Sequence, residues 1–221
     1  MVTPDGERTM NTFLGAAQDL KPSDIDATAI SSAAVTYLEG YLWDPPQAKE
    51  AFVKAASIAH KAGQQVALTL SDAFCVDRYR GEFLDLIRKR TVDIVFANEK
   101  ELQSLYETSD FAAAAKALRA DAKLAVVTRS ENGCVVLDGR GDVAVPAEKV
   151  DKVVDVTGAG DLFAAGFLVG LARGKDHRTA ARLGALCAAE VIQHMGARPE
   201  VSLKVLAEAN GLLVETGPGA A

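Results

Sequence analysis

The strongest chemical signal in the sequence is the run Asp155-Val156-Thr157-Gly158-Ala159-Gly160-Asp161, which leads directly into the apolar residues 162–167. A helix that begins here would expose main-chain N–H groups without intrahelical partners, and its dipole would add partial positive charge. Glycines let an anion approach those N–H groups closely. The sequence therefore predicts an anion hole formed by Gly158, Ala159 and Gly160.

Asp161 stands beside this predicted anion hole. A carboxylate there would repel a bound phosphate unless it has a chemical task, and accepting a proton from an attacking hydroxyl is such a task. The alternative is that Asp161 caps the helix and the glycines form a tight turn. Two other phosphate-binding motifs are excluded, because Asp176 follows Gly174-Lys175 where a Walker A loop needs Ser or Thr, and Phe163 replaces the last glycine of a dinucleotide fingerprint.

A second signal lies just past the apolar run 92–96, where Asn98 and Glu101 are three residues apart. That spacing places them close together at the start of a helix. They are suited to hold a hydrated Mg²⁺ through water, which is the usual habit of that ion. The alternative is a capping box, with Asn98 as the N-cap and Glu101 at the third helical position.

A third signal is Thr128-Arg129-Ser130-Glu131-Asn132-Gly133, which follows the apolar run 124–128. Hydroxyls and a glycine at the end of a strand are suited to meet the phosphates or ribose of a nucleotide. The alternative is an ordinary surface turn that leads into a hairpin.

The elements that must position these signals alternate along the chain. β-branched and apolar runs predict strands at 34–38, 66–70, 92–96 and 124–128. A hairpin is expected from 135–137 and 143–145 around the turn-rich residues 138–142. Helical spacing predicts helices over 46–62, 77–90, 99–106, 111–119, 162–173, 179–194 and 202–209. This alternation implies a parallel sheet covered by helices, with ligands at the carboxyl ends of its strands.

Composition limits the class of protein. Of the 221 residues, 49% are hydrophobic and 24% charged, which is typical of a globular protein, and the net charge is −6. A net negative charge disfavours nucleic acid as a partner. No apolar stretch is long enough to cross a membrane, and the first residues show no signal peptide. The odd number of cysteines, three without a C-x-x-C pair, favours reduced thiols and a cytoplasmic protein.

Taken together, the three signals resemble the ribokinase family, also called PfkB carbohydrate kinases. The run 155–161 resembles the family's D-T-G-A-G-D signature, with one extra residue, and Asn98 and Glu101 resemble its N-x-x-E motif. Residues 128–133 are similar to its T-x-G-x-x-G nucleotide element, although Ser130 replaces the middle glycine. The resemblance implies a Rossmann-like three-layer sandwich whose mostly parallel sheet is flanked by helices.

The resemblance also implies a role for each residue of the motifs. Asp161 would be the catalytic base, and the anion hole would stabilise the transferring phosphoryl group of ATP. Asn98 and Glu101 would organise Mg²⁺ through water. The remaining nucleotide-binding residues implied by the resemblance are Asn98, Thr128, Ser130, Gly133, Thr157 and Gln193.

Two further sites are implied only by the resemblance. The adenine would lie between residues 149–154 and the late helix that bears Ala189 and Gln193. A monovalent cation such as K⁺ would bind near Asp155, Thr157 and Gly196.

Members of the family are longer than this sequence, which resembles their C-terminal two-thirds without the N-terminal part. Residues 1–15 would be the remnant of a β-sheet lid, residues 16–214 a partial ribokinase-like α/β domain, and residues 215–221 a tail. The missing part would normally supply most substrate contacts. An exposed sheet edge makes a homodimer a further expectation.

The substrate is narrowed by three stretches that resemble adenosine-kinase-like members, at 37–43, 70–74 and 192–199. Phe74 is suited to stack on a purine, whereas packing is the alternative for Phe74, Tyr41 and Trp43. The sequence thus predicts an ATP-dependent phosphotransferase acting on a hydroxymethyl group of adenosine, another nucleoside or a sugar. The alternative is a non-catalytic nucleotide-binding fragment of such a kinase.

Overall fold

The structure, a computed structural model, describes residues 1–213. The predicted tail at 215–221 lies outside this part. The chain divides into two compact units. The first, which we call the sheet unit, comprises Thr12–Arg129 and Val135–Ala144. The second, the helical unit, comprises Met1–Asn11, Ser130–Cys134 and the chain from Val145 onward. Each unit is described by itself.

Six strands form one sheet in the order β1-β2-β3-β4-β5-β6. Neighbours from β1 to β4 are parallel. Strands β5 and β6 are joined by only two residues, which requires an antiparallel hairpin. The predicted mostly parallel α/β fold is confirmed. The strands are β1 (Val35–Glu39), β2 (Gln65–Thr69), β3 (Ile94–Asn98), β4 (Leu124–Thr128), β5 (Cys134–Asp138) and β6 (Gly141–Val145).

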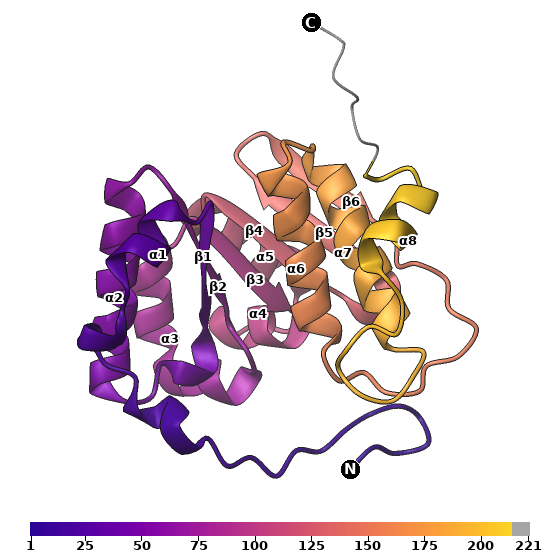
Figure 1. The fold of residues 1–221 in the computed structure, drawn as a ribbon, viewed down its shortest axis with the longest axis horizontal. Helices are drawn as coiled ribbons and strands as arrows, with labels where there is room; N and C mark the ends of the chain where they lie inside the picture. Colours follow the sequence, from indigo (N-terminus) through magenta and orange to yellow (C-terminus); the bar gives the residue numbers. More distant parts are fainter. Residues whose placement is uncertain (214–221) are drawn as a thin grey trace, which may run out of the picture. The chain divides into compact units, whose positions relative to one another are not determined.

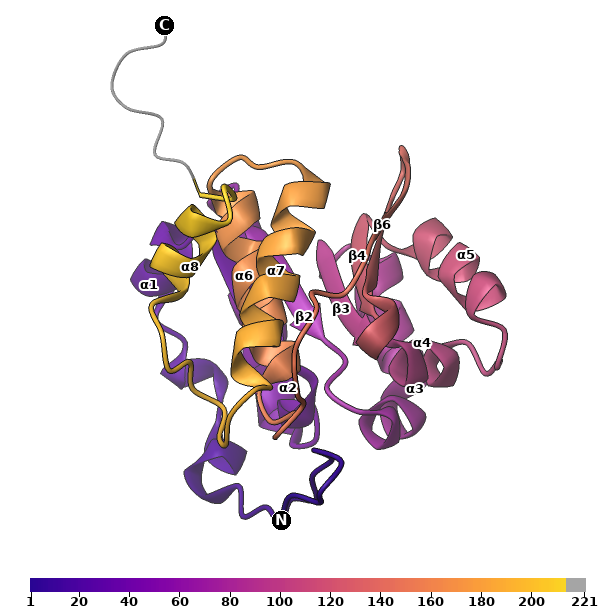
Figure 2. The same ribbon diagram turned by 90° about the vertical axis from the view of Figure 1, so that its right-hand side faces the viewer.

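Five helices belong to the sheet unit: α1 (Ala27–Ser32), α2 (Pro46–Lys61), α3 (Ala73–Arg88), α4 (Glu99–Leu105) and α5 (Phe111–Asp121). One apolar cluster contains buried residues of α2, α3, α4 and α5 together with alternate residues of the strands, such as Val66, Leu68, Val95 and Val127. Alternate residues share one face of a sheet, so these helices cover the same face. Figure 2 shows α3, α4 and α5 together on that side of the strands.

The helices predicted at 46–62, 77–90, 99–106 and 111–119 are confirmed, with ends that differ by one or two residues and one start that differs by four. Helix α3 begins at Ala73, four residues before the predicted start, because the Asp72 carboxylate accepts a hydrogen bond from Cys75 N–H and caps the helix. Helix α1 was not predicted. It has only six residues, and Asp26 caps it through the N–H groups of Thr28 and Ala29.

The helical unit contains α6 (Ala159–Ala172), α7 (His177–Val191) and α8 (Leu203–Ala209), drawn in orange and yellow in Figure 1. Helices α6 and α7 approach each other closely through small residues. A Cβ atom placed on Gly184 would lie 2.6 Å from the carbonyl oxygen of Phe163, so only glycine fits there. This close contact fixes α6, and with it the segment that precedes α6.

The chain begins with a turn at residues 3–7. Val2 and Arg8 form an antiparallel bridge around it, and Val156 N–H donates to Gly6 O. The assignment of residues 1–15 to a lid stays a prediction. All three cysteines are buried and unbonded to one another. Among the helices of residues 1–213, none is both long and apolar enough to cross a membrane.

Candidate active site

The start of α6 has the geometry expected of an anion hole. Gly158 is its N-cap and has the left-handed conformation, with φ +82°. A Cβ at Gly158 would lie 2.8 Å from the Cβ of Ala197. Any larger residue is therefore excluded both by backbone conformation and by space. Asp161 does not cap the helix, which removes the structural alternative for this residue. It is exposed and stands in the first turn.

The main-chain N–H groups at this helix start are used unequally. Ala159 N–H donates to Val156 O at 3.2 Å, and Leu162 N–H donates to Gly158 O at 2.9 Å. The N–H groups of Gly158, Gly160 and Asp161 have no main-chain partner within residues 1–213. A Cβ at Gly160 would meet no atom within 4 Å, so the surface there is open. The free donors and the Asp161 carboxylate thus lie in the same turn.

Asp155 holds this turn in place. One carboxylate oxygen accepts from Thr157 N–H at 2.9 Å and from Thr157 Oγ1 at 2.5 Å, and the other accepts from Gly196 N–H at 2.9 Å. These hydrogen bonds, led by that of the Thr157 hydroxyl, lower the pKa of Asp155. The structure brings together the three residues expected around a monovalent cation, and both oxygens of Asp155 already accept hydrogen bonds there.

The second motif forms the capping box that was its structural alternative. Asn98 caps α4 through Glu101 N–H, while Asn98 N–H and Nδ2 donate to the two oxygens of Glu101 at 2.9 Å and 2.6 Å. Asn98 ends β3 and is paired in register with Thr128 at the end of β4. The polar ends of these two strands therefore lie at one edge of the sheet, as predicted.

The Glu101 carboxylate is in an unfavourable setting for a negative charge. The residue is 4% exposed. Burial raises its pKa to about 7, and the charges of Asp72 and Glu39 act in the same direction, against the hydrogen bond from Asn98 N–H. The Glu39 carboxylate accepts a hydrogen bond from Ser71 Oγ. Sequence reasoning missed Glu39 and Asp72, although Glu39 directly follows one predicted strand and Asp72 lies two residues after another.

In the third motif, Ser130 stands where the family has a glycine, and its backbone keeps a conformation that is typical of glycine. Ser130 has φ +49°, in the left-handed region where a glycine would be at ease. Gly133 also has positive φ, and its N–H donates to Ser130 O. The backbone thus forms a tight turn, and the serine replaces a glycine without changing the left-handed conformation.

The residues expected around the adenine are partly brought together. The N–H groups of Val154 and Asp155 donate to Ile192 O, so the end of the segment 149–154 lies against the end of α7. Gln193, which follows α7, uses its side-chain Nε2 to donate to Ala189 O of that helix at 2.9 Å. In this conformation the side-chain amide of Gln193 is already hydrogen-bonded to a neighbouring carbonyl group.

The three aromatic residues behave differently. Trp43 is 4% exposed and packs against Phe52 and Phe83, which confirms the packing interpretation for this residue. Phe74, in the first turn of α3, is 80% exposed, so packing does not explain it. Tyr41 is half-exposed, and its N–H donates to Ser71 Oγ.

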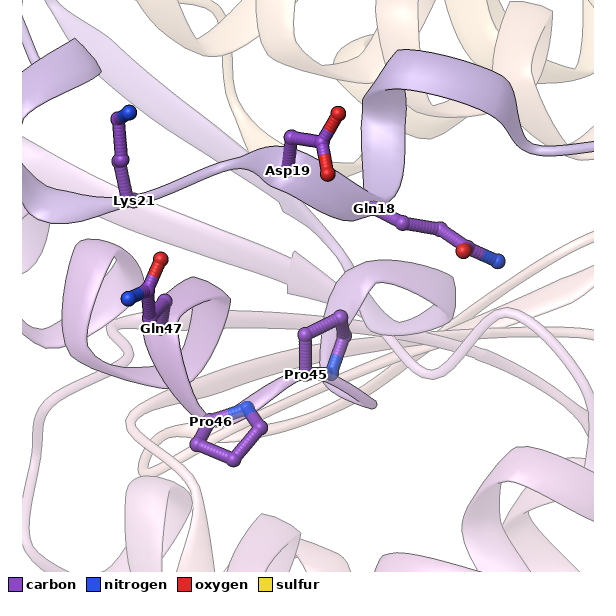
Figure 3. A pocket seen from close by; sticks show the side chains of 6 residues that line it. All are labelled: Gln18, Asp19, Lys21, Pro45, Pro46 and Gln47. Atoms are coloured by element: carbon purple, nitrogen blue, oxygen red, sulfur yellow. The ribbon is translucent and has the colours of Figure 1, made fainter.

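An open depression on the sheet unit lies apart from the motifs. Figure 3 shows the six side chains that line it, which come from the segments before α1 and at the start of α2. None of the predicted site residues is among them. They are Gln18, Asp19, Lys21, Pro45, Pro46 and Gln47.

Comparison with known proteins agrees with the motifs. The family described as pfkB family carbohydrate kinase matches residues 1–203. A probable sugar kinase from Rhizobium etli has a TM-score of 0.94 and 55% identity, and an adenosine kinase from Sinorhizobium meliloti has a TM-score of 0.93 and 54% identity. The matches cover 96% and 95% of this chain. A cytidine kinase from Thermococcus kodakarensis is 41% identical over 126 residues, which are 53% of this chain.

The coverage of these relatives is partial. The chain spans 64% of each of the two solved structures and 45% of the cytidine kinase. The family match nevertheless includes all three motifs and nearly the whole described chain. The match thus covers both the start of α6, with its free N–H groups, and the capping box of Asn98 and Glu101. This chain belongs to the pfkB family of carbohydrate kinases.

Proposed function

We propose that this chain carries the phosphoryl-transfer machinery of an ATP-dependent kinase that phosphorylates a hydroxymethyl group of a nucleoside, with adenosine as the first candidate. The observation that carries the proposal is the start of α6, where an exposed carboxylate and free main-chain N–H groups share one turn. The Asp161 carboxylate does not cap the helix, so the usual structural role of an aspartate at a helix start does not explain it.

Asp161 is the proposed general base. It accepts the proton of the substrate hydroxyl as that oxygen attacks the γ-phosphorus of ATP, and ADP leaves. The free N–H groups of Gly158, Gly160 and Asp161 stabilise the charge on the transferring phosphoryl oxygens. Ala159 contributes its small size, since its own N–H is bonded to Val156 O.

Among the described residues, no three acidic, His or Cys side chains come close enough together to bind a metal ion directly, so a divalent cation at the carboxyl edge of the sheet unit would be held through water, as Mg²⁺ often is. A pKa of about 7 for Glu101 indicates that its negative charge lacks a positive partner. We propose that Asn98 and Glu101 hold Mg²⁺ through water, because both oxygens of Glu101 already accept from Asn98. The ion would supply positive charge to the phosphates of ATP.

Phe74 supports a nucleoside rather than a simple sugar. An aromatic ring of this size is seldom left 80% exposed without a partner, and a purine is a good stacking partner. The ring is carried on a well-anchored segment, since Asp72 caps α3 and Cys75 Sγ donates to Gly40 O at 3.2 Å. A sugar would bury less of such a ring.

The test is substrate-dependent ADP release from Mg-ATP with adenosine, other nucleosides, ribose and fructose. Asp161→Asn is the matched control, because it keeps the shape of the side chain and removes the base. We expect the variant to lose about 10³-fold or more in kcat while ATP binding persists. Turnover that survives in Asp161→Asn would disprove the role of this residue.

Phe74→Ala sharpens the choice of substrate. We expect the KM for adenosine to rise about tenfold, with little change for ribose, because only the nucleoside offers a base for stacking. An equal effect on both substrates would indicate that the ring does not read the base. ATP binding by the wild-type chain without transfer to any compound would instead support the non-catalytic alternative.

A further inference from the structure

Three side chains at the end of α7 have no part in the roles proposed above. His194 Nε2 lies 3.2 Å from Glu190 Oε1, and His194 Nδ1 lies 3.8 Å from Glu200 Oε1. Glu190 Oε1 also accepts from Glu200 N–H at 2.9 Å. The imidazole therefore stands between the carboxylate of Glu190, in α7, and that of Glu200. We call Glu190, His194 and Glu200 the α7 clasp.

Two members of the clasp, Glu190 and His194, are deeply placed, whereas the Glu200 side chain is 70% exposed. The Glu190 side chain is 9% exposed and that of His194 is 14% exposed. Glu190 Oε2 and His194 Nδ1 are buried without a hydrogen-bond partner within residues 1–213. Glu190 Oε1 meets both His194 Nε2 and Glu200 N–H, and a carboxylate as buried as Glu190 depends on such partners.

The segment closed by the clasp supports the start of α6. Gly196 N–H donates to Asp155 Oδ2 at 2.9 Å. Ala197 packs against Gly158 so closely that a Cβ on Gly158 would lie 3.1 Å from the Ala197 Cα and carbonyl oxygen. Both contacts come from residues between His194 and Glu200. Movement of this segment would release Asp155 and the N-cap of α6 together.

We propose that Glu190 and His194 are positioning residues for phosphoryl transfer: they fix the segment 195–200, and through Gly196 and Ala197 they hold the anion hole in its working geometry. This inference rests on the function proposed for the start of α6. Donors aimed at a developing charge act only when they are held in place beforehand, so a loosened support lowers the rate more than the affinity.

The first test follows hydrogen exchange at two amides, Thr157 N–H and Gly196 N–H, which both donate to Asp155. In His194→Ala we expect exchange at both to rise about tenfold, because the support is weakened locally. His194→Gln keeps a donor toward Glu190 and should restore most of the protection. The matched control is Lys204→Ala, which breaks the exposed Lys204–Glu208 pair of α8 in the same unit and should leave both amides unchanged.

The second test uses turnover. We expect His194→Ala to lower kcat about tenfold while the KM for ATP changes less than about twofold, with recovery in His194→Gln. A fall in stability alone would change the amount of active protein and would not be rescued in this pattern. If the wild type transfers no phosphoryl group, the proposed function fails, but the exchange experiment still decides whether the clasp supports the anion hole.

The proposal is overturned if His194→Ala folds and exchange at Thr157 and Gly196 stays at the wild-type rate. If His194→Ala does not fold, Glu200→Gln replaces it, because that side chain is 70% exposed and its removal leaves the Glu200 N–H bond to Glu190 intact. We expect about a threefold rise in exchange in Glu200→Gln, and no rise would equally overturn the proposal.

Discussion

The two ends of β3 each carry a buried carboxylate, and the two are treated in opposite ways. Asp93, before the strand, accepts from Val66 N–H at 2.9 Å, from His60 Nε2 at 2.8 Å and from Lys123 Nζ at 3.1 Å. Glu101, after the strand, exchanges hydrogen bonds with Asn98 and lies near the charges of Asp72 and Glu39. The first carboxylate is compensated by hydrogen-bond donors within the fold, whereas burial and acidic neighbours raise the pKa of the second.

The pKa values follow this difference. Burial would raise the pKa of Asp93, but hydrogen bonds from Val66, His60 and Lys123 outweigh it and leave the pKa below its ordinary value. Burial, together with the charges of Asp72 and Glu39, raises the pKa of Glu101 to about 7. A satisfied carboxylate at the amino end of a sheet indicates a structural role. A carboxylate whose pKa is raised at the carboxyl end, where parallel sheets bind ligands, is a candidate for a binding role.

The largest effect on stability is expected at Asp93, the compensated carboxylate before β3. Asp93→Ala should lower the free energy of unfolding by about 2–4 kcal/mol, because it removes the acceptor shared by a buried N–H and two side chains that are partly solvent-screened. Urea denaturation at pH 7 measures the loss. The control is Lys89→Ala, which breaks an exposed ion pair with Asp85. A loss no larger than in that control would contradict the structural role of Asp93.

The same variant has a defined pH dependence. Because the folded pKa of Asp93 is lowered, its stabilisation is present above the unfolded pKa and is lost as the pH falls through the folded pKa. The difference between wild type and Asp93→Ala should therefore shrink in acid.

Glu101→Gln should act in the opposite direction. The raised pKa means that the folded state holds its proton more tightly, so stability falls as the pH rises from the ordinary pKa of Glu to about 7. Without metal at pH 8, the variant should be more stable than wild type by about 1–3 kcal/mol, and this gain should vanish near pH 4. Urea denaturation across this range measures it. A pH-independent loss of stability would show that the capping box outweighs the charge.

A smaller effect is expected from the cation itself. At pH 8, millimolar Mg²⁺ should raise the melting temperature of the wild type by about 2–5 °C, because binding to the folded state alone is stabilising. Glu101→Gln should lose this increase, whereas Asp93→Ala, though less stable, should keep it. An equal response in wild type and Glu101→Gln would place the cation elsewhere.

The smallest effect is expected for Lys123→Ala. The Lys123 side chain is mostly exposed, so water screens its ion pair with Asp93 and the loss should be about 0.5 kcal/mol. The measurement is urea denaturation beside Asp93→Ala. A loss as large as that of Asp93→Ala would mean that the ammonium, rather than the hydrogen bonds from Val66 and His60, compensates the carboxylate.

Much of the fold could be read from the sequence because its signals are local. The strands are short, apolar runs, and the helices follow helical spacing between capping residues and glycines. The start of α3 was misplaced because Asp72 was not recognised as a cap. The motif residues could be found for the same reason, since a glycine turn, an N-x-x-E spacing and a strand end are each contained within a few residues.

The sequence by itself determined which segments form strands and helices, and that the residues 155–161 lead into a helix with an open start. Only the tertiary structure decided what holds those residues. Gly196 N–H reaches Asp155 across 41 positions, and Asp93 gathers donors 27 to 33 positions away. Such contacts depend on the packing of helices and on the register of strands, and no local pattern encodes the partner of a side chain so distant along the chain.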